Sequence, residues 1–185
     1  HMFLTGVMEA MDESHEIIIT YQKYTKTESE SFTLHPYAVK EFAKRWYVIA
    51  YCKERSDLRV YGLDRVKSLE MTENKFRMPE NFDVDELFST SFGIYIPEGK
   101  PMFIKYRAAD EKQSKYLRDL PIHRSQEELG HDGKGNVFRI FVCPNDNLIM
   151  EFCKYGNRIE ILEPLEIRTK VGETLKAAAE QYENK

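Results

Sequence analysis

Short apolar segments separated by polar turns fill the first part of the chain, and this pattern restricts it to a few folds. The segments are rich in β-branched and aromatic residues, and none is long enough for a helix. They cover residues 16–24, 31–35, 45–52, 58–63 and 65–71. We expect the second strand to end at Pro36, because proline cannot donate to a strand ladder. Five short strands without an intervening helix predict a small antiparallel β-barrel over residues 16–75.

The regions on either side of this barrel are interpreted as connections. An apolar stripe at helical spacing predicts a short helix in residues 1–15, formed by Leu4, Val7, Met8 and Met11. We interpret this helix as a connector from a missing N-terminal region. Residues 76–100 contain two prolines and a helical turn capped by Asp83, and we interpret them as a linker.

Residues 101–185 alternate between strand and helix patterns. The predicted strands cover residues 102–107, 136–142, 159–161 and 165–168. The predicted helices cover residues 108–118, 147–156 and 172–182, and Gly156 is placed as a C-terminal cap. This alternation predicts a ferredoxin-like α+β layer. The whole chain is therefore assigned to the α+β class.

Positive charge is concentrated in one part of an acidic chain. The formal net charge is −4, from 27 Lys and Arg against 31 Asp and Glu. Residues 35–67 carry eight Lys or Arg against four acidic residues, a local charge of +4, so the remainder carries −8. An acidic remainder disfavours duplex DNA binding by the surface as a whole. A binding site for an anion is therefore expected in the basic segment.

No segment predicts a membrane span, a secreted protein or a metal centre. No apolar run reaches the roughly 18 residues of a membrane helix, and a secretory signal is absent, so we expect a cytoplasmic protein. Cys52, Cys143 and Cys153 lie far apart in apolar surroundings, which favours buried thiols over disulfides or metal ligands. We expect no cofactor.

Three blocks in order resemble the WYL domain of bacterial transcriptional regulators. They are His35-Pro36-Tyr37, then Arg45-Trp46-Tyr47-Val48, then residues 58–66. The second part resembles the C-terminal extension of the same family, through residues 116–126, 155–157 and 160–168. Two positions depart from the family pattern: Val48 replaces leucine, and Gly62 stands where a second arginine is frequent.

The resemblance implies a Sm-like or SH3-like barrel followed by a ferredoxin-like extension, usually behind an N-terminal winged helix-turn-helix. It implies a ligand-sensing and dimerising region that binds single-stranded nucleic acid or a nucleotide and controls promoter DNA binding by the N-terminal domain. A homodimer is expected, because two-fold operators imply two-fold proteins.

Six residues of these blocks form the predicted binding patch on the barrel: His35, Tyr37, Arg45, Tyr47, Arg59 and Arg65. The arginines would contact phosphates, and the tyrosines would supply ring faces or hydroxyl donors. Strand alternation independently puts Arg45 beside Tyr47, and Arg59 beside Tyr61. Aromatic rings beside guanidinium groups are how small barrels hold single strands without demanding a sequence.

Other interpretations of these residues stay open. Trp46 is expected in the core, His123 is expected to fix the start of a strand, and His131 is expected at a hairpin tip. The chain has none of the common phosphate-loop, hydrolase or metalloprotease motifs, so we expect no enzyme. The alternatives are a purely structural dimerisation module and a nucleotide-processing enzyme. A sensor should bind its ligand unchanged, an enzyme should convert it, and a structural module should do neither.

Overall fold

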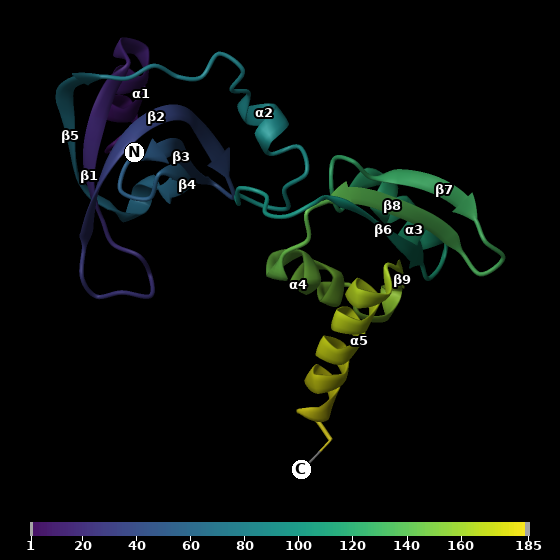
Figure 1. Cartoon of the computed structure of the whole chain (residues 1–185). Coiled ribbons are helices and arrows are strands. Elements are labelled where there is room, and N and C mark those ends of the chain that lie inside the picture. The colour runs from purple at the N-terminus through teal and green to yellow at the C-terminus, as the bar shows by residue number, and fades with distance from the viewer. Residues whose placement is uncertain (1, 184–185) are drawn as a thin grey trace. The chain divides into compact units, whose positions relative to one another are not determined.

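The computed structural model describes residues 2–183 and divides the chain into two compact units (Figure 1). The first unit extends to Leu87 and includes Ile94–Ile96, and the second contains Phe88–Gly93 and continues from Pro97. Residues 76–100, interpreted as a linker, are thus divided between the two units. Each unit has its own antiparallel sheet, which confirms the α+β class.

The first unit is a curved five-stranded sheet with a helix packed against it (Figure 1). Its elements are α1 (Leu4–Glu13), β1 (His15–Tyr21), β2 (Glu30–Phe42), β3 (Arg45–Cys52), β4 (Asp57–Gly62), the 3₁₀ turn η1 (Leu63–Arg65), β5 (Val66–Lys75) and α2 (Val84–Leu87). The strand order is β4-β3-β2-β1-β5. The predicted barrel is not closed, because β4 and β5 form the two edges. The chain passes between these edges through η1, whose Leu63 is buried in the core, instead of through a β4–β5 ladder.

The main hydrophobic cluster of this unit lies on one face of the sheet, although Ile49 is also fully buried on the other face. On β3 the buried Val48, Ala50 and Cys52 point into the core. Trp46 lies on the same face but is only partly buried, so it packs against the core from its margin. Helix α1 adds Val7 and Ala10, both fully buried, and is therefore packed as a part of this unit.

Strand β2 continues past the proline at which we expected it to end. The pairing with β3 shifts between Pro36 and Ala38, which marks an irregularity in the ladder. Such a bulge accommodates a residue without an N–H donor and lets the strand bend. The expected end at Pro36 is wrong because the ladder is re-established beyond this bulge.

The second unit is a four-stranded sheet with helices packed against one face. Its elements are β6 (Met102–Ala108), α3 (Glu111–Asp119), β7 (Glu127–His131), β8 (Asn136–Val142), α4 (Asp146–Lys154), the 3₁₀ turn η2 (Gly156–Arg158), β9 (Ile159–Glu163) and α5 (Leu165–Glu180). The strand order is β7-β8-β6-β9, and every pairing is antiparallel. The side chains of Asp110 and Asn145 cap α3 and α4 by accepting backbone N–H bonds. Gly156 has φ +58°, the left-handed conformation expected after a helix.

Two predictions for this unit are corrected. Residues 165–168, predicted as a strand, form the first turn of α5. The reason is a helical spacing that extends beyond four residues: Ile167 and Val171 lie one turn apart and are both buried in the core. Strand β7 was not predicted, because it is an edge strand with every residue exposed and has no apolar alternation.

The cysteines and His123 can be compared with their predicted surroundings. Cys52 and Cys143 are buried thiols, as predicted, whereas Cys153 is only partly buried. His123 is held by Ser125 Oγ at 2.7 Å from its Nδ1 and by the carbonyl of Ser91 at 2.9 Å from its Nε2. Burial lowers the pKa of His123, which favours the neutral ring. Among residues 2–183, no helix has both the length and the apolar character needed to cross a membrane.

Candidate ligand-binding site

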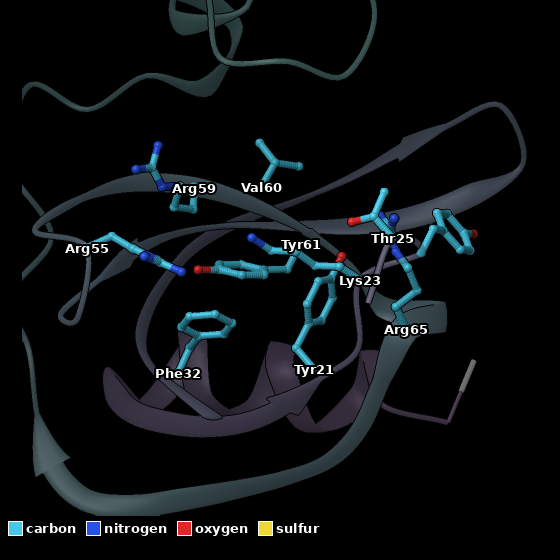
Figure 2. Close-up of a pocket in the computed structure, with 10 residues that line it drawn as sticks. Tyr21, Lys23, Thr25, Phe32, Arg55, Arg59, Val60, Tyr61 and Arg65 are labelled. Carbon is cyan, nitrogen blue, oxygen red and sulfur yellow. The ribbon is translucent and has the colours of Figure 1, made fainter. Parts of the chain in front are cut away.

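The first unit contains an open hollow of about 410 Å³ whose lining combines aromatic rings with basic side chains (Figure 2). The loop after β1, the start of β2, the turn before β4, β4 itself and η1 all contribute to it. The lining residues are Tyr21, Lys23, Tyr24, Thr25, Phe32, Arg55, Arg59, Val60, Tyr61 and Arg65. We call this feature the basic hollow.

Three buried rings form the floor of the basic hollow. The rings of Tyr21 and Tyr61 meet edge to face with centroids 5.1 Å apart, and Phe32 lies 5.4 Å from Tyr61. Figure 2 shows the three rings grouped together, with Arg55 on one side of them and Arg65 on the other. Burial raises the pKa of both tyrosines, so their hydroxyls are neutral at physiological pH. The floor is therefore aromatic and uncharged.

Arg65 is the cation most closely integrated into this site. Its guanidinium carbon lies 4.3 Å from the ring centroid of Tyr24 and 5.5 Å from that of Tyr21. Both distances are within the range of a cation–π interaction. The Nε atom of Arg65 is buried and has no hydrogen-bond partner among the described residues. A buried donor without a partner is rare in folded proteins.

Two other arginines that line the hollow form ion pairs with carboxylates at the surface. Arg59 lies 3.6 Å from Asp57, and Arg55 lies 3.5 Å from Glu30. Figure 2 shows the Arg55 guanidinium pointing toward the hydroxyl of Tyr61. Ion pairs at exposed positions contribute little to stability.

The structure brings together three of the six predicted site residues. Arg59 and Arg65 line the hollow directly. Arg45 borders it, because its Nη1 donates a 2.6 Å hydrogen bond to the hydroxyl of Tyr24 and lies 3.5 Å from Asp64. Tyr24 is itself a lining residue and 68% exposed, although Arg65 covers one face of its ring.

The other three predicted residues lie on the opposite face of the sheet. His35 pairs with Tyr51 and Arg59 pairs with Ala50, and consecutive residues of β3 point to opposite faces. The ring of His35 stacks on Phe76 at 4.9 Å. Strand alternation separates His35 from Arg59, so the predicted single patch is not formed. Arg45 is on the same face of β3 as Tyr47, but it is the first residue of the strand, and its side chain reaches Tyr24 and Asp64 beside the hollow.

Tyr37 and Tyr47 also lie away from the basic hollow. Tyr37 contacts the rings of Phe76 and Phe82 with centroids 5.9 and 5.1 Å away, and burial raises its pKa. Tyr47 is half-buried and pairs with Lys40 and Gly62, on the same face of β3 as Tyr51. Neither ring contributes to the lining of the hollow.

Sequence reasoning missed several residues of the hollow, above all Tyr21, Phe32 and Arg55. Tyr21 and Phe32 belong to strands that resemble ordinary core strands, so nothing local marks them as site residues. Arg55 does lie in the basic segment of the sequence. Its charge was the one signal that could have placed it in the site.

Gly62 creates the space that the Arg65 side chain occupies. A Cβ atom at position 62 would lie 2.8 Å from Arg65 Nη2 and 2.9 Å from Asp64 Oδ1. Arginine is frequent at this position in the family that the sequence resembles. The absence of a side chain at position 62 therefore leaves room for the guanidinium of Arg65.

We expect Gly62→Ala to weaken ligand binding without unfolding the protein. The backbone of Gly62 has φ −73°, which alanine adopts without strain, so only the side-chain ends of Arg65 and Asp64 must move. We expect a melting temperature close to that of the wild type and at least a fivefold lower affinity for a nucleotide, measured by calorimetric titration. Gly172→Ala on α5 is the control, because a Cβ there contacts nothing within 4 Å. Equal affinities for all three proteins would show that the position of Arg65 does not matter.

A buried carboxylate holds the opposite face of the sheet together. Glu16 is 3% exposed. Its carboxylate oxygens lie 3.3 Å from His35 Nε2, 3.2 Å from Lys53 Nζ and 3.1 Å from Asn74 Nδ2. Burial raises the pKa of Glu16, but the hydrogen bonds from Lys53, Asn74 and His35 outweigh this effect and leave the pKa below its ordinary value. His35 therefore has a structural partner on this face.

We expect Glu16→Gln to lower the stability at pH 7 by about 1–3 kcal/mol, since it leaves buried charge-assisted hydrogen bonds incomplete. A depressed carboxyl pKa stabilises the fold above the unfolded-state value of 4.5, and this contribution is lost as the pH falls below it. Melting curves at pH 7 and at about pH 3.5 should therefore differ less for Glu16→Gln than for the wild type. Glu13→Gln, at a carboxylate with 63% of its side chain exposed, is the control. An identical pH response in all three would contradict this role.

Comparison with known proteins gives the family. Residues 2–71 match the WYL domain and residues 104–179 match the WCX domain. The chain therefore belongs to the WYL-domain proteins and carries a WYL domain followed by a WCX domain, as the sequence resemblance predicted. Among the described residues, no group of three or more His, Cys, Asp or Glu side chains is placed to hold a metal ion.

The named relatives are transcriptional regulators. The chain is 28% identical over 171 residues to an uncharacterized HTH-type transcriptional regulator, YobV, of Bacillus subtilis, covering 86% of the chain and 51% of that protein. It is 34% identical over 61 residues to the DNA-binding transcriptional repressor CapW of Pseudomonas aeruginosa, covering 33% of the chain and 20% of the repressor. The chain thus spans at most about half the length of these relatives.

A solved structure is similar in fold. A CRISPR Cas-related protein, known from a crystal structure, superposes with a TM-score of 0.57 at 16% identity and covers 95% of the chain and 50% of that protein. This likeness concerns the fold alone.

Proposed function

We propose that this chain is the ligand-sensing region of a bacterial transcriptional regulator and that the basic hollow binds a single-stranded nucleic acid or a nucleotide. The observation that carries the proposal is the composition of the hollow. Buried rings form its floor, Lys23, Arg55, Arg59 and Arg65 surround it, and the buried Nε of Arg65 lacks a partner. A planar anionic ligand complements each of these features.

The chemistry of the hollow favours a ligand that has both a base and a phosphate. An aromatic side chain contributes about 1–3 kcal/mol for each base stacked on it, and Tyr24 presents an exposed ring. Guanidinium groups bind phosphate oxygens through short, directional hydrogen bonds. Asp57 and Glu30 form ion pairs with Arg59 and Arg55. A phosphate that binds these arginines would replace the two carboxylates.

The regulatory setting of this site follows from the family. We propose that the sensing region controls a helix-turn-helix domain elsewhere in the full-length protein and that this domain binds promoter DNA in the cytoplasm. Within this proposal the first unit is a Sm-like sheet with an N-terminal helix, and the second is a ferredoxin-like layer. The βαββαβ order of β6 to β9 with α3 and α4 supports the second assignment.

The proposal includes a homodimer formed chiefly through the second unit. We expect sedimentation at micromolar concentration to show a species twice the chain mass of 21.8 kDa. A purely structural dimerisation module would sediment in the same way but would bind no nucleotide. A single species of chain mass at these concentrations would argue against dimerisation by this region.

The test of the sensing function is a titration of mononucleotides and short single-stranded oligonucleotides at several salt concentrations. We expect binding that weakens with salt, with a logarithmic slope near −0.7 for each phosphate neutralised on a single strand. Chromatography of the recovered ligand separates a sensor, which leaves it intact, from a nucleotide-processing enzyme. No binding of any anionic ligand at low salt would reject the proposal.

A further inference from the structure

A second aromatic surface lies on the open face of the sheet in the second unit, away from its helices. On β6 the residues Ile104, Tyr106 and Ala108 are fully buried in the core, so the alternate residues point to the other face. These alternate residues are Phe103, Lys105 and Arg107. Their partners on β8 are Phe141, Arg139 and Val137.

The two central strands place a pair of phenylalanines side by side on this face. Phe103 and Phe141 are directly opposite in the ladder, and their ring centroids are 4.7 Å apart. Phe103 is 49% exposed. The guanidinium carbon of Arg139 lies 4.2 Å from the Phe103 ring centroid, within the range of a cation–π interaction. Because these two rings are on the open face, they contribute little to the hydrophobic core of the unit. Exposed aromatic rings of this kind are suited to stacking with bases.

Positive charge adjoins the ring pair on the same two strands. Lys105 and Arg139 form the next pair of the ladder. The acidic partners of these cations lie on the flanking strands: Glu163 on β9 is 3.5 Å from Lys105, and Glu127 on β7 is paired with Arg139. The central strands therefore form a positive strip with negative margins.

Arg107, the third of these residues on β6, forms ion pairs within the unit. It donates to Asp132 at 2.6 Å and lies 3.0 Å from Glu160, and its side chain is only 15% exposed. It is therefore engaged within the unit, and Lys105 and Arg139 are the cations that an incoming phosphate meets first.

We propose that this face, defined by Phe103, Lys105, Arg139 and Phe141, is a second binding surface that stacks the unpaired bases of single-stranded nucleic acid. The strand order, with β6 and β8 in the centre, puts the two rings where four-stranded RNA-binding sheets carry their base-stacking aromatics. Phosphates of the strand would follow the positive strip of the central strands. This surface is independent of the basic hollow and does not rest on the function proposed for it.

The test separates stacking from hydrophobic docking by the choice of side chain. The full chain is prepared with Phe103→Leu/Phe141→Leu, which keeps the apolar character, and with Phe103→Tyr/Phe141→Tyr, which keeps the rings. Anisotropy of a labelled oligothymidylate at low salt should show at least tenfold weaker binding for the leucine variant. The tyrosine variant should remain within about threefold of the wild type. Tyr116→Leu is the control, because Tyr116 on α3 is 51% exposed and outside this face.

The same measurements in an Arg59→Ala/Arg65→Ala background distinguish the two sites. We expect residual oligonucleotide binding in this background that disappears with the leucine substitutions, while mononucleotide binding by the leucine variant stays at the wild-type level. If the wild type binds no mononucleotide, the function proposed for the basic hollow is wrong. The oligonucleotide measurements still test the second surface in that case. Equal oligonucleotide binding by the leucine variant and the wild type would overturn the proposal. A change in sedimentation without a change in oligonucleotide binding would also overturn it and would assign the face to protein contact.

Discussion

Replacing Arg59 and Arg65 together by alanine should lower the affinity for a mononucleotide roughly 100-fold, because each charge-assisted hydrogen bond that is lost contributes about 1.5 kcal/mol. The melting temperature should fall by no more than a few degrees. Arg59 has 46% of its side chain exposed and forms one long ion pair with Asp57, and each cation–π contact of Arg65 with Tyr21 and Tyr24 contributes about 1 kcal/mol. Calorimetric titration of both proteins with the same nucleotide measures the difference.

The control for this result removes the same charge elsewhere. Lys112→Ala/Lys115→Ala changes two exposed residues of α3 in the second unit and reduces the net charge equally. We expect this variant to bind the mononucleotide as the wild type does. If both double variants lose affinity to the same extent, binding depends on net charge alone, and the basic hollow is an ordinary solvated surface.

Tyr106→Ala should destabilise the protein by about 3–5 kcal/mol, the largest effect on stability that we expect from one substitution. Tyr106 lies on the central strand β6 and is fully buried. Its ring centroid is 6.0 Å from that of Phe138 and 5.8 Å from that of Phe152. Its hydroxyl donates to Gln126 Oε1, which also accepts the N–H of Ile122. Truncation therefore removes both ring packing and a buried hydrogen bond.

Tyr106→Phe separates these two contributions, because it keeps the ring and removes only the hydroxyl, at a cost of about 1 kcal/mol. Urea unfolding followed by circular dichroism measures both variants. Fluorescence of Trp46, the single tryptophan, reports the first unit separately. We expect the alanine variant to shift the circular dichroism transition more than the fluorescence transition. Equal stabilities of the alanine and phenylalanine variants would contradict the packing role of the ring.

Some strands and helices could be predicted from the sequence and others could not, and the difference has physical reasons. Strands β3 and β8 have the predicted bounds because an apolar segment of strand length is a local property of the sequence. The first turn of α5 was predicted as a strand because four residues cannot distinguish the two periods, and the helical spacing of Ile167 and Val171 only becomes clear over two turns. Strand β7 is held by pairing with β8 rather than by its own composition.

The sequence by itself determined the family, the α+β class and the basic segment that contains Arg59 and Arg65, since these depend on composition and on the order of local patterns. Only the tertiary structure decided which side chains share a site. His35 and Arg59 were predicted together, yet the register of β2, β3 and β4 places them on opposite faces of one sheet. Tyr21 and Phe32 enter the hollow from β1 and β2 because their strands pair and bend around a common core. A strand's own residues specify alternation, but the partner strands and the bulge after Pro36 determine which residues of different strands meet.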